Sequence, residues 1–149
     1  MFKNRRGFTL IELLVVIGIL AVLLAITLIA VNPAQNLQDA DDTKRRSDVN
    51  AILNAVSQYM VDNNGVAPTA ITTTPTDLGN LGINICTLIV PKYIAALPQD
   101  PLNNNGADIS AGDCAGTYSS GYNISAVDNR ITVDAPGANT GSGTITVTR

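Results

Sequence analysis

The sequence predicts an α+β protein, in which one long N-terminal helix carries a small antiparallel β domain. A strongly apolar run with a single charge extends from Phe8 to Val31, near the N-terminus. The C-terminal half is polar, rich in Gly, Asn and Thr, and alternates apolar and polar residues in short stretches, as half-buried strands do. We therefore expect the first segment to lie in lipid and the second to fold in water.

The apolar run is long enough to cross a membrane. Leu13–Val31 carries no charge, and about twenty apolar residues span a bilayer core as a helix. A short basic leader, residues 1–7, precedes the run, and the end of the run offers no small-residue site for secretory cleavage. Because basic flanks stay in the cytoplasm, we expect residues 8–31 to span the inner membrane, with the N-terminus inside and the C-terminal domain outside.

Beyond the span, apolar residues recur at helical spacing, which predicts that the helix continues as an amphipathic half over residues 32–64. Pro33 is expected to bend this helix without ending it. Asn64 and Gly65 supply a stop, since Gly suits the left-handed position after a last turn. The positive cluster Lys44–Arg46 lies among aspartates, which indicates a solvated, salt-bridged helix face.

Residues 65–149 are predicted to form a small loop-rich β domain. Asp128-Asn129 is a candidate tight hairpin turn. Leu88–Leu97, which contains Pro91, suggests a short buried helix or turn, and Thr69–Thr76 reads as a loop by composition. The expected strands are Tyr118–Ser125, Arg130–Ala135 and Thr144–Thr148.

Composition excludes several classes of function. The chain has no His and its sole Glu is Glu12, so most acid–base and nucleophilic arrangements cannot be built. We therefore expect no enzyme. The formal net charge is −3, and part of the basic complement lies in the leader, which argues against strong nucleic-acid binding because such binding depends on Lys and Arg that neutralise phosphates.

The cysteines Cys86 and Cys114 both lie in the polar half of the chain. A translocated domain meets an oxidising compartment, so a disulfide between them is the favoured interpretation. The alternative is two buried free thiols that act as small apolar side chains.

The segment from Arg5 through Gly7, Phe8 and Glu12 to Leu13 resembles the N-terminal signal of type IV pilins and type II secretion pseudopilins. The resemblance includes the basic leader, the Gly before the cleaved bond, the Phe after it, the Glu four residues later and the long apolar helix. It implies that a prepilin peptidase cuts after Gly7 and N-methylates Phe8. It also implies assembly of the mature chain into a filament through its N-terminal helix.

Glu12 has two interpretations. Thr9 and Glu12 fit a capping box, in which the Glu side chain binds the free amide at the helix start. Alternatively, a carboxylate at the edge of an apolar span needs a specific partner, and the new ammonium group of Phe8 is the obvious one. On that hypothesis Phe8 and Glu12 are assembly residues.

The segment Leu97–Pro101 resembles the Leu-Pro-x-Asp-Pro segment of major pseudopilins, which carry calcium in a loop that follows it. Here Asp100, Asn103 and Asp108 are weak candidates for oxygen ligands. A solvated turn region rich in Asn and Asp is the favoured interpretation, and we expect no cofactor.

The resemblance implies a structural subunit of a type IV pilus-like filament, and the alternative is a pseudopilin of a type II secretion system. The implied partners are further copies, other pilin-like subunits, the prepilin peptidase, an assembly ATPase and a platform membrane protein. Before assembly the chain would be a single-pass inner-membrane protein, and afterwards part of an extracytoplasmic filament. A membrane-anchored binding domain that never polymerises would explain the span, but not the motif before it.

Overall fold

The computed structural model describes residues 7–138 and 143–149 of the 149-residue chain. The chain divides into two units, Met1–Leu37 and Gln38–Arg149, which are taken one at a time. Of the expected basic leader only Gly7 is among the described residues, and part of the Gly-rich connection before the last strand, residues 139–142, also lies outside them.

The first unit contains helix α1, Leu10–Val31, which has no buried residue. Its large apolar side chains are exposed all around the helix, and it belongs to a helical stretch long and apolar enough to cross a membrane. A helix that is apolar on every side needs a surrounding of lipid or of other helices. The structure thus agrees with the expected anchor.

The helix breaks for one residue at Asn32 and resumes as α2, Pro33–Asp62. Asn32 has left-handed backbone angles, φ 40° and ψ 73°. The residue before a proline is pushed out of the helical region, and Asn tolerates the left-handed conformation. Pro33 then takes the first position of the new helix, which suits its fixed φ. A bend at Pro33 without an end to the helix was expected; the structure instead ends α1 at Val31 and interrupts the helix for one residue at Asn32.

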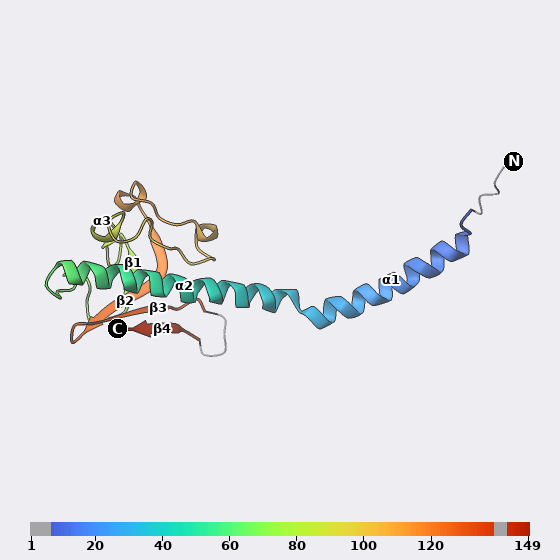
Figure 1. Ribbon diagram of the computed structural model, residues 1–149, viewed down its shortest axis with the longest axis horizontal. Coiled ribbons are helices and arrows are strands. Elements are labelled where there is room, and N and C mark those ends of the chain that lie inside the picture. The colour runs from blue at the N-terminus through green and yellow to red at the C-terminus, as the bar shows by residue number, and fades with distance from the viewer. Residues whose placement is uncertain (1–6, 139–142) are drawn as a thin grey trace. The chain divides into compact units, whose positions relative to one another are not determined.

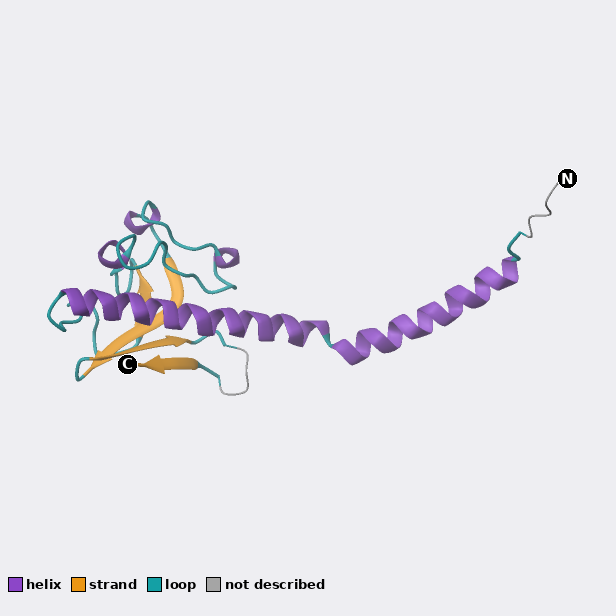
Figure 2. Cartoon of the chain, in the orientation of Figure 1, coloured by secondary structure: helices purple, strands orange, loops and turns teal. Residues whose placement is uncertain are grey.

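In the second unit, α2 packs one face onto the β-sheet, as Figures 1 and 2 show. Its apolar side chains Val49, Ile52, Leu53 and Val56 are buried in the same core as the sheet residues Tyr122, Ile124, Ile131 and Val133. The end of α2 follows the expected pattern, because Gly65, at φ 82°, donates its N–H to the carbonyl oxygen of Met60 at 2.7 Å.

The sheet is antiparallel, with its strands in the order β1-β2-β3-β4. The strands are β1 (Thr76–Gly79), β2 (Ser119–Val127), β3 (Arg130–Ala135) and β4 (Ile145–Thr148). Asp128 and Asn129 join β2 to β3 with φ of 50° and 61°. Two central residues at positive φ match the right-handed twist of the flanking strands, so the predicted hairpin is confirmed.

The structure adds elements that the sequence did not predict. Strand β1 begins at Thr76, the last residue of the expected Thr-rich loop. It is short and carries Asp and Gly, which are depleted in strands, so its pattern gave no signal. The short helix near the prolines, α3, spans Cys86–Ile89, slightly earlier than expected. Two 3-10 turns, η1 (Asn104–Gly106) and η2 (Asp113–Ala115), complete the domain.

Candidate processing and assembly site

The N-terminal residues of the first unit form a capping box around Thr9 and Glu12. The Thr9 N–H donates to Glu12 Oε2 at 2.8 Å, and the Glu12 N–H donates to Thr9 Oγ1 at 3.3 Å. The Thr9 hydroxyl also donates to Glu12 Oε2, at 2.7 Å. Each residue thus satisfies a free amide at the start of α1. Both bonds that the Glu12 side chain accepts fall on Oε2, so its Oε1 is left for another donor.

The bond expected to be cleaved lies just outside this helix start. Gly7 and Phe8 precede α1 in non-helical backbone, and Phe8 is 81% exposed. A Cβ placed on Gly7 would meet nothing within 4 Å among the described atoms. Gly7 and Phe8 therefore form a non-helical and accessible segment next to the cap.

A shallow groove marks one side of α1 at Gly18. Its volume is about 440 Å³, and Gly18 has nothing within 4 Å of an added Cβ. Small residues on apolar helices allow a second helix to approach closely. The remaining residues around the groove are all aliphatic: Leu14, Val15, Ile19, Val22 and Leu23.

In the second unit, an ionic cluster fixes the Leu97–Pro101 loop to α2. Arg45 is fully buried, and its guanidinium donates to both carboxylate oxygens of Asp100, from Nε at 2.7 Å and from Nη2 at 3.0 Å. Nη1 donates to Asp42 at 2.8 Å. This fork geometry is the strong form of a charge-assisted bond. A solvated helix face was expected here, and for Arg45 that expectation is wrong.

A second layer of the same cluster reaches strand β2. Lys44 Nζ donates to Asp48 Oδ2 and to the carbonyl oxygen of Gln99, each at 2.9 Å. The buried Tyr122 hydroxyl donates to Asp48 Oδ2 at 2.7 Å. Lys44 and Arg45 of α2 thus bind Gln99 and Asp100 of the loop. Asp48 of α2 accepts a hydrogen bond from Tyr122 of strand β2.

The charges in this cluster shift one another's pKa values. The bonds to Asp100 raise the pKa of Arg45 above its ordinary range, against the effect of burial, and Asp42 adds to the rise. Burial would raise the pKa of Asp100, but the bonds from Arg45 and from the Leu102 N–H prevail and lower it. Burial and the Asp48 carboxylate raise the pKa of Tyr122. At neutral pH Arg45 and Asp100 are therefore charged, and the Tyr122 phenol is neutral.

The candidate calcium ligands do not form a calcium site. Both oxygens of Asp100 are bound by the buried guanidinium of Arg45, which would repel a second cation. Asn103 and Asp108 lie at a cavity that Asp100 does not line. Within the described residues, no three carboxylate or thiol side chains are placed to hold a metal ion, whereas calcium takes six to eight oxygens as a rule. These residues do not fit the metal that the resemblance implies.

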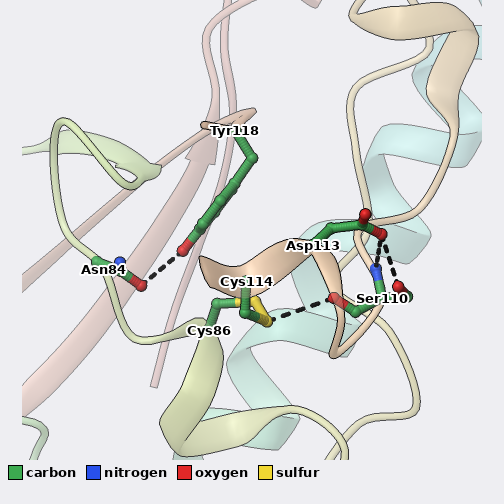
Figure 3. Close-up of a disulfide and its surroundings, with 6 residues drawn as sticks. All are labelled: Asn84, Cys86, Ser110, Asp113, Cys114 and Tyr118. Carbon is green, nitrogen blue, oxygen red and sulfur yellow. Dashed lines mark hydrogen bonds between the residues drawn. A yellow bond between two sulfur atoms is a disulfide. The ribbon is translucent and has the colours of Figure 1, made fainter. Parts of the chain in front are cut away.

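Cys86 of α3 and Cys114 of η2 are bonded to each other, with their Cα atoms 5.5 Å apart (Figure 3). Both residues belong to the buried core. Beside the bridge, the Tyr118 hydroxyl donates to Asn84 at 2.7 Å. In the chain-entropy account, closing a loop of this size stabilises a domain by about 3 to 4 kcal/mol, which matters for so small a core.

The N-terminal motif, the uniformly apolar α1 and the α2-on-sheet domain define a pilin-like, membrane-anchored subunit. Residues 2–28 match the prokaryotic N-terminal methylation motif. The chain belongs to the family of type II secretion system core protein G. It is 35% identical to that protein of Aeromonas hydrophila over 74% of this chain and 76% of the relative. It is 33% identical to the Vibrio cholerae protein over 74% and 75%, and 35% identical to that of Escherichia coli K12 over 74% and 75%. No solved structure matches the chain.

The Arg45 cluster was not predicted from the sequence as a structural centre. The spacing of Asp42 and Arg45 was a usable signal for a pair within one helix. The dominant partner, Asp100, lies 55 residues away in the sequence, and no local pattern links the two. Burial of an arginine is also rare unless it is paired.

Proposed function

We propose that this chain is a structural, non-catalytic subunit of a type II secretion pseudopilus, processed after Gly7 and assembled through α1. Membership of the core protein G family carries the proposal, and it favours secretion over the type IV pilus that the motif alone left open. The exposed apolar surface of α1 supports assembly through the helix, because none of the residues of α1 is buried by the described part of the chain.

In the proposed cycle, α1 anchors the precursor in the inner membrane with the folded domain outside. The prepilin peptidase removes residues 1–7 and methylates the new N-terminus at Phe8. Subunits then leave the membrane to join a filament, with the help of an assembly ATPase, a platform membrane protein and other pilin-like subunits. The domain forms its Cys86–Cys114 bridge once it reaches the oxidising side.

Glu12 and Phe8 are the proposed assembly residues. When α1 passes from lipid into a protein core, an unpaired carboxylate and an unpaired ammonium would each be costly to bury. Glu12 Oε1 is unused by the capping box, so it can accept from the Phe8 ammonium of a neighbouring subunit while the cap persists. The pair would neutralise both charges and set the axial position of the incoming subunit.

Mass spectrometry of the membrane fraction should show a mature chain that begins at Phe8. Loss of Met1–Gly7 and one added methyl group are expected, because the bond after Gly7 lies in an accessible segment next to the helix cap. An inactive prepilin peptidase should leave the precursor uncut, as the matched control. A mature pool that retains Met1 would contradict the processing site.

Deletion of the gene should abolish type II secretion in its own host and leave long surface fibres unaffected. The measurement compares secreted protein in the medium with electron microscopy of sheared surface fractions, for wild type, deletion and complemented strains. Normal secretion together with loss of surface fibres in the deletion strain would favour the type IV pilus instead. Unchanged secretion and unchanged fibres would contradict both filament hypotheses.

A further inference from the structure

A polar cavity of about 770 Å³ opens in the second unit, between strand β1, the start of strand β2 and the loop segment 99–113. Asp77, Asp108 and Asp113 all line it, and none of its lining residues, which are all in the described part of the chain, is Lys or Arg. The nearby Lys44 ammonium is bound to Asp48 and to the Gln99 carbonyl. The cavity is therefore negatively charged without a counter-ion from its own walls.

The cavity also contains an unused acceptor. Gln99 lines it and is only 6% exposed. Its Nε2 donates to the Ser119 carbonyl oxygen at 2.7 Å, but the buried Oε1 has no hydrogen-bond partner in the structure. A buried acceptor left unpaired costs the desolvation of that group. A donor that entered the cavity would satisfy it.

Two of the three aspartates that line the cavity already accept hydrogen bonds within the subunit. Asp113 Oδ2 accepts both the N–H and the hydroxyl of Ser110, and Asp77 Oδ1 accepts from the Ser119 hydroxyl at 2.9 Å. The Asp108 side chain has no partner among the described residues. They do not converge closely enough to hold a metal ion. A larger cation with several donors, such as a guanidinium, fits this arrangement better.

One arginine on α2 matches this chemistry. Lys44 and Arg45 are bound within their own subunit, but the Arg46 side chain is exposed and has no partner among the described residues. It lies on the helix that continues from the proposed assembly span. Its positive charge is complementary to the cavity, whose described lining carries three aspartates and no Lys or Arg.

We propose that the Asp77–Asp108–Asp113 cavity of one subunit receives the Arg46 guanidinium of a second copy of this chain. The guanidinium would pair with Asp108 and donate to the unpartnered Gln99 Oε1. This contact deepens the proposed function and depends on it, since only a filament holds the copies side by side. It gives the outer layer of the filament a specific charged contact in addition to the apolar core.

Crosslinking of filaments made from two mixed full-length variants tests the contact directly. One variant carries Arg46→Cys and the other carries Asp108→Cys, so a crosslinked dimer forms only between copies. The native cysteines are bonded to each other and stay unreactive. A short bismaleimide suits the test, because an arginine–carboxylate contact separates the Cα atoms beyond disulfide reach. A strong dimer band in the mixture, absent with Arg130→Cys in place of Arg46→Cys, is expected.

Charge exchange supplies the energetic test. Arg46→Glu or Asp108→Arg should each reduce filament yield about tenfold or more, because like charges then meet across the interface, and the double variant should recover most of the yield. Arg130→Glu is the matched control and should assemble normally, because the Arg130 side chain is also exposed and has no partner among the described residues.

The possible results distinguish failure of the Arg46 contact from failure of the proposed pseudopilus function. Normal yield from Arg46→Glu, or no recovery in the double variant, would overturn the contact while wild-type filaments uphold the proposed function. A yield that depends on added calcium and not on Arg46 would assign the cavity to a metal ion and also overturn it. Absence of filaments from the wild-type chain would overturn both.

Discussion

Replacement of Glu12 by Val should abolish filament assembly and leave membrane insertion intact. Insertion should be unimpaired or easier, because the change removes a charge from the edge of the span. Assembly should fail because the ammonium of the neighbouring Phe8 then enters a protein core without its carboxylate. The measurement is filament yield at matched membrane levels of wild type and variant. Wild-type yield from Glu12→Val would refute the charge pair.

Glu12→Gln separates the two roles of this side chain. The amide can still accept the Thr9 N–H that Glu12 Oε2 accepts at 2.8 Å, so the cap is retained. If the charge drives assembly, Glu12→Gln should assemble as poorly as Glu12→Val. Normal yield from Glu12→Gln would assign the residue to the cap alone.

Replacement of Arg45 by Met should destabilise the domain by about 3 to 5 kcal/mol, the usual cost of removing one partner of a buried ion pair. The change leaves Asp100 buried without the guanidinium that binds both of its oxygens. Urea unfolding of the full-length chain in detergent measures the loss. Arg46→Met is the matched control one residue along the helix, and an exposed substitution of this kind should stay within about 0.5 kcal/mol.

The same ion pair should give the wild-type domain a specific dependence on pH. The folded-state pKa of Asp100 lies below its ordinary value of 3.8. Its contribution to stability is therefore fully present above that ordinary value and is lost as the pH falls through the lowered one. Arg45→Met should remove this part of the acid dependence. An acid transition that is identical in wild type and Arg45→Met would contradict the assignment to Asp100.

The sequence predicted the elements whose signals are local. The charge-free run made α1 visible, the helical spacing of apolar residues made α2 visible, and Asp128-Asn129 identified the hairpin. Strand β1 escaped because a strand of four residues with Asp and Gly carries no readable alternation. It forms because β2 is present to pair with it.

The functional residues also differ in how far the sequence predicts them. Gly7, Phe8 and Glu12 lie within one short segment, so a single motif points to all of them. The cluster around Arg45 depends on the fold, because α2, the Leu97–Pro101 loop and β2 meet only in three dimensions. The aspartates beside Arg45 and Lys44 in the sequence suggested surface pairs. The structure instead buries Arg45, and the acceptor that binds its guanidinium with both oxygens is Asp100 of the distant Leu97–Pro101 loop.

The loop that carries Asp100 lies inside the ring closed by Cys86 and Cys114, which are 28 residues apart in the sequence. A protease that cuts once within this ring separates no fragment, because the two new ends belong to pieces that the sulfur bridge still joins. The Arg45–Asp100 pair and the bonds of Lys44 to Gln99 then hold the middle of the ring against α2. The domain should therefore keep its shape after such a nick, and the two pieces should separate only after reduction of the bridge.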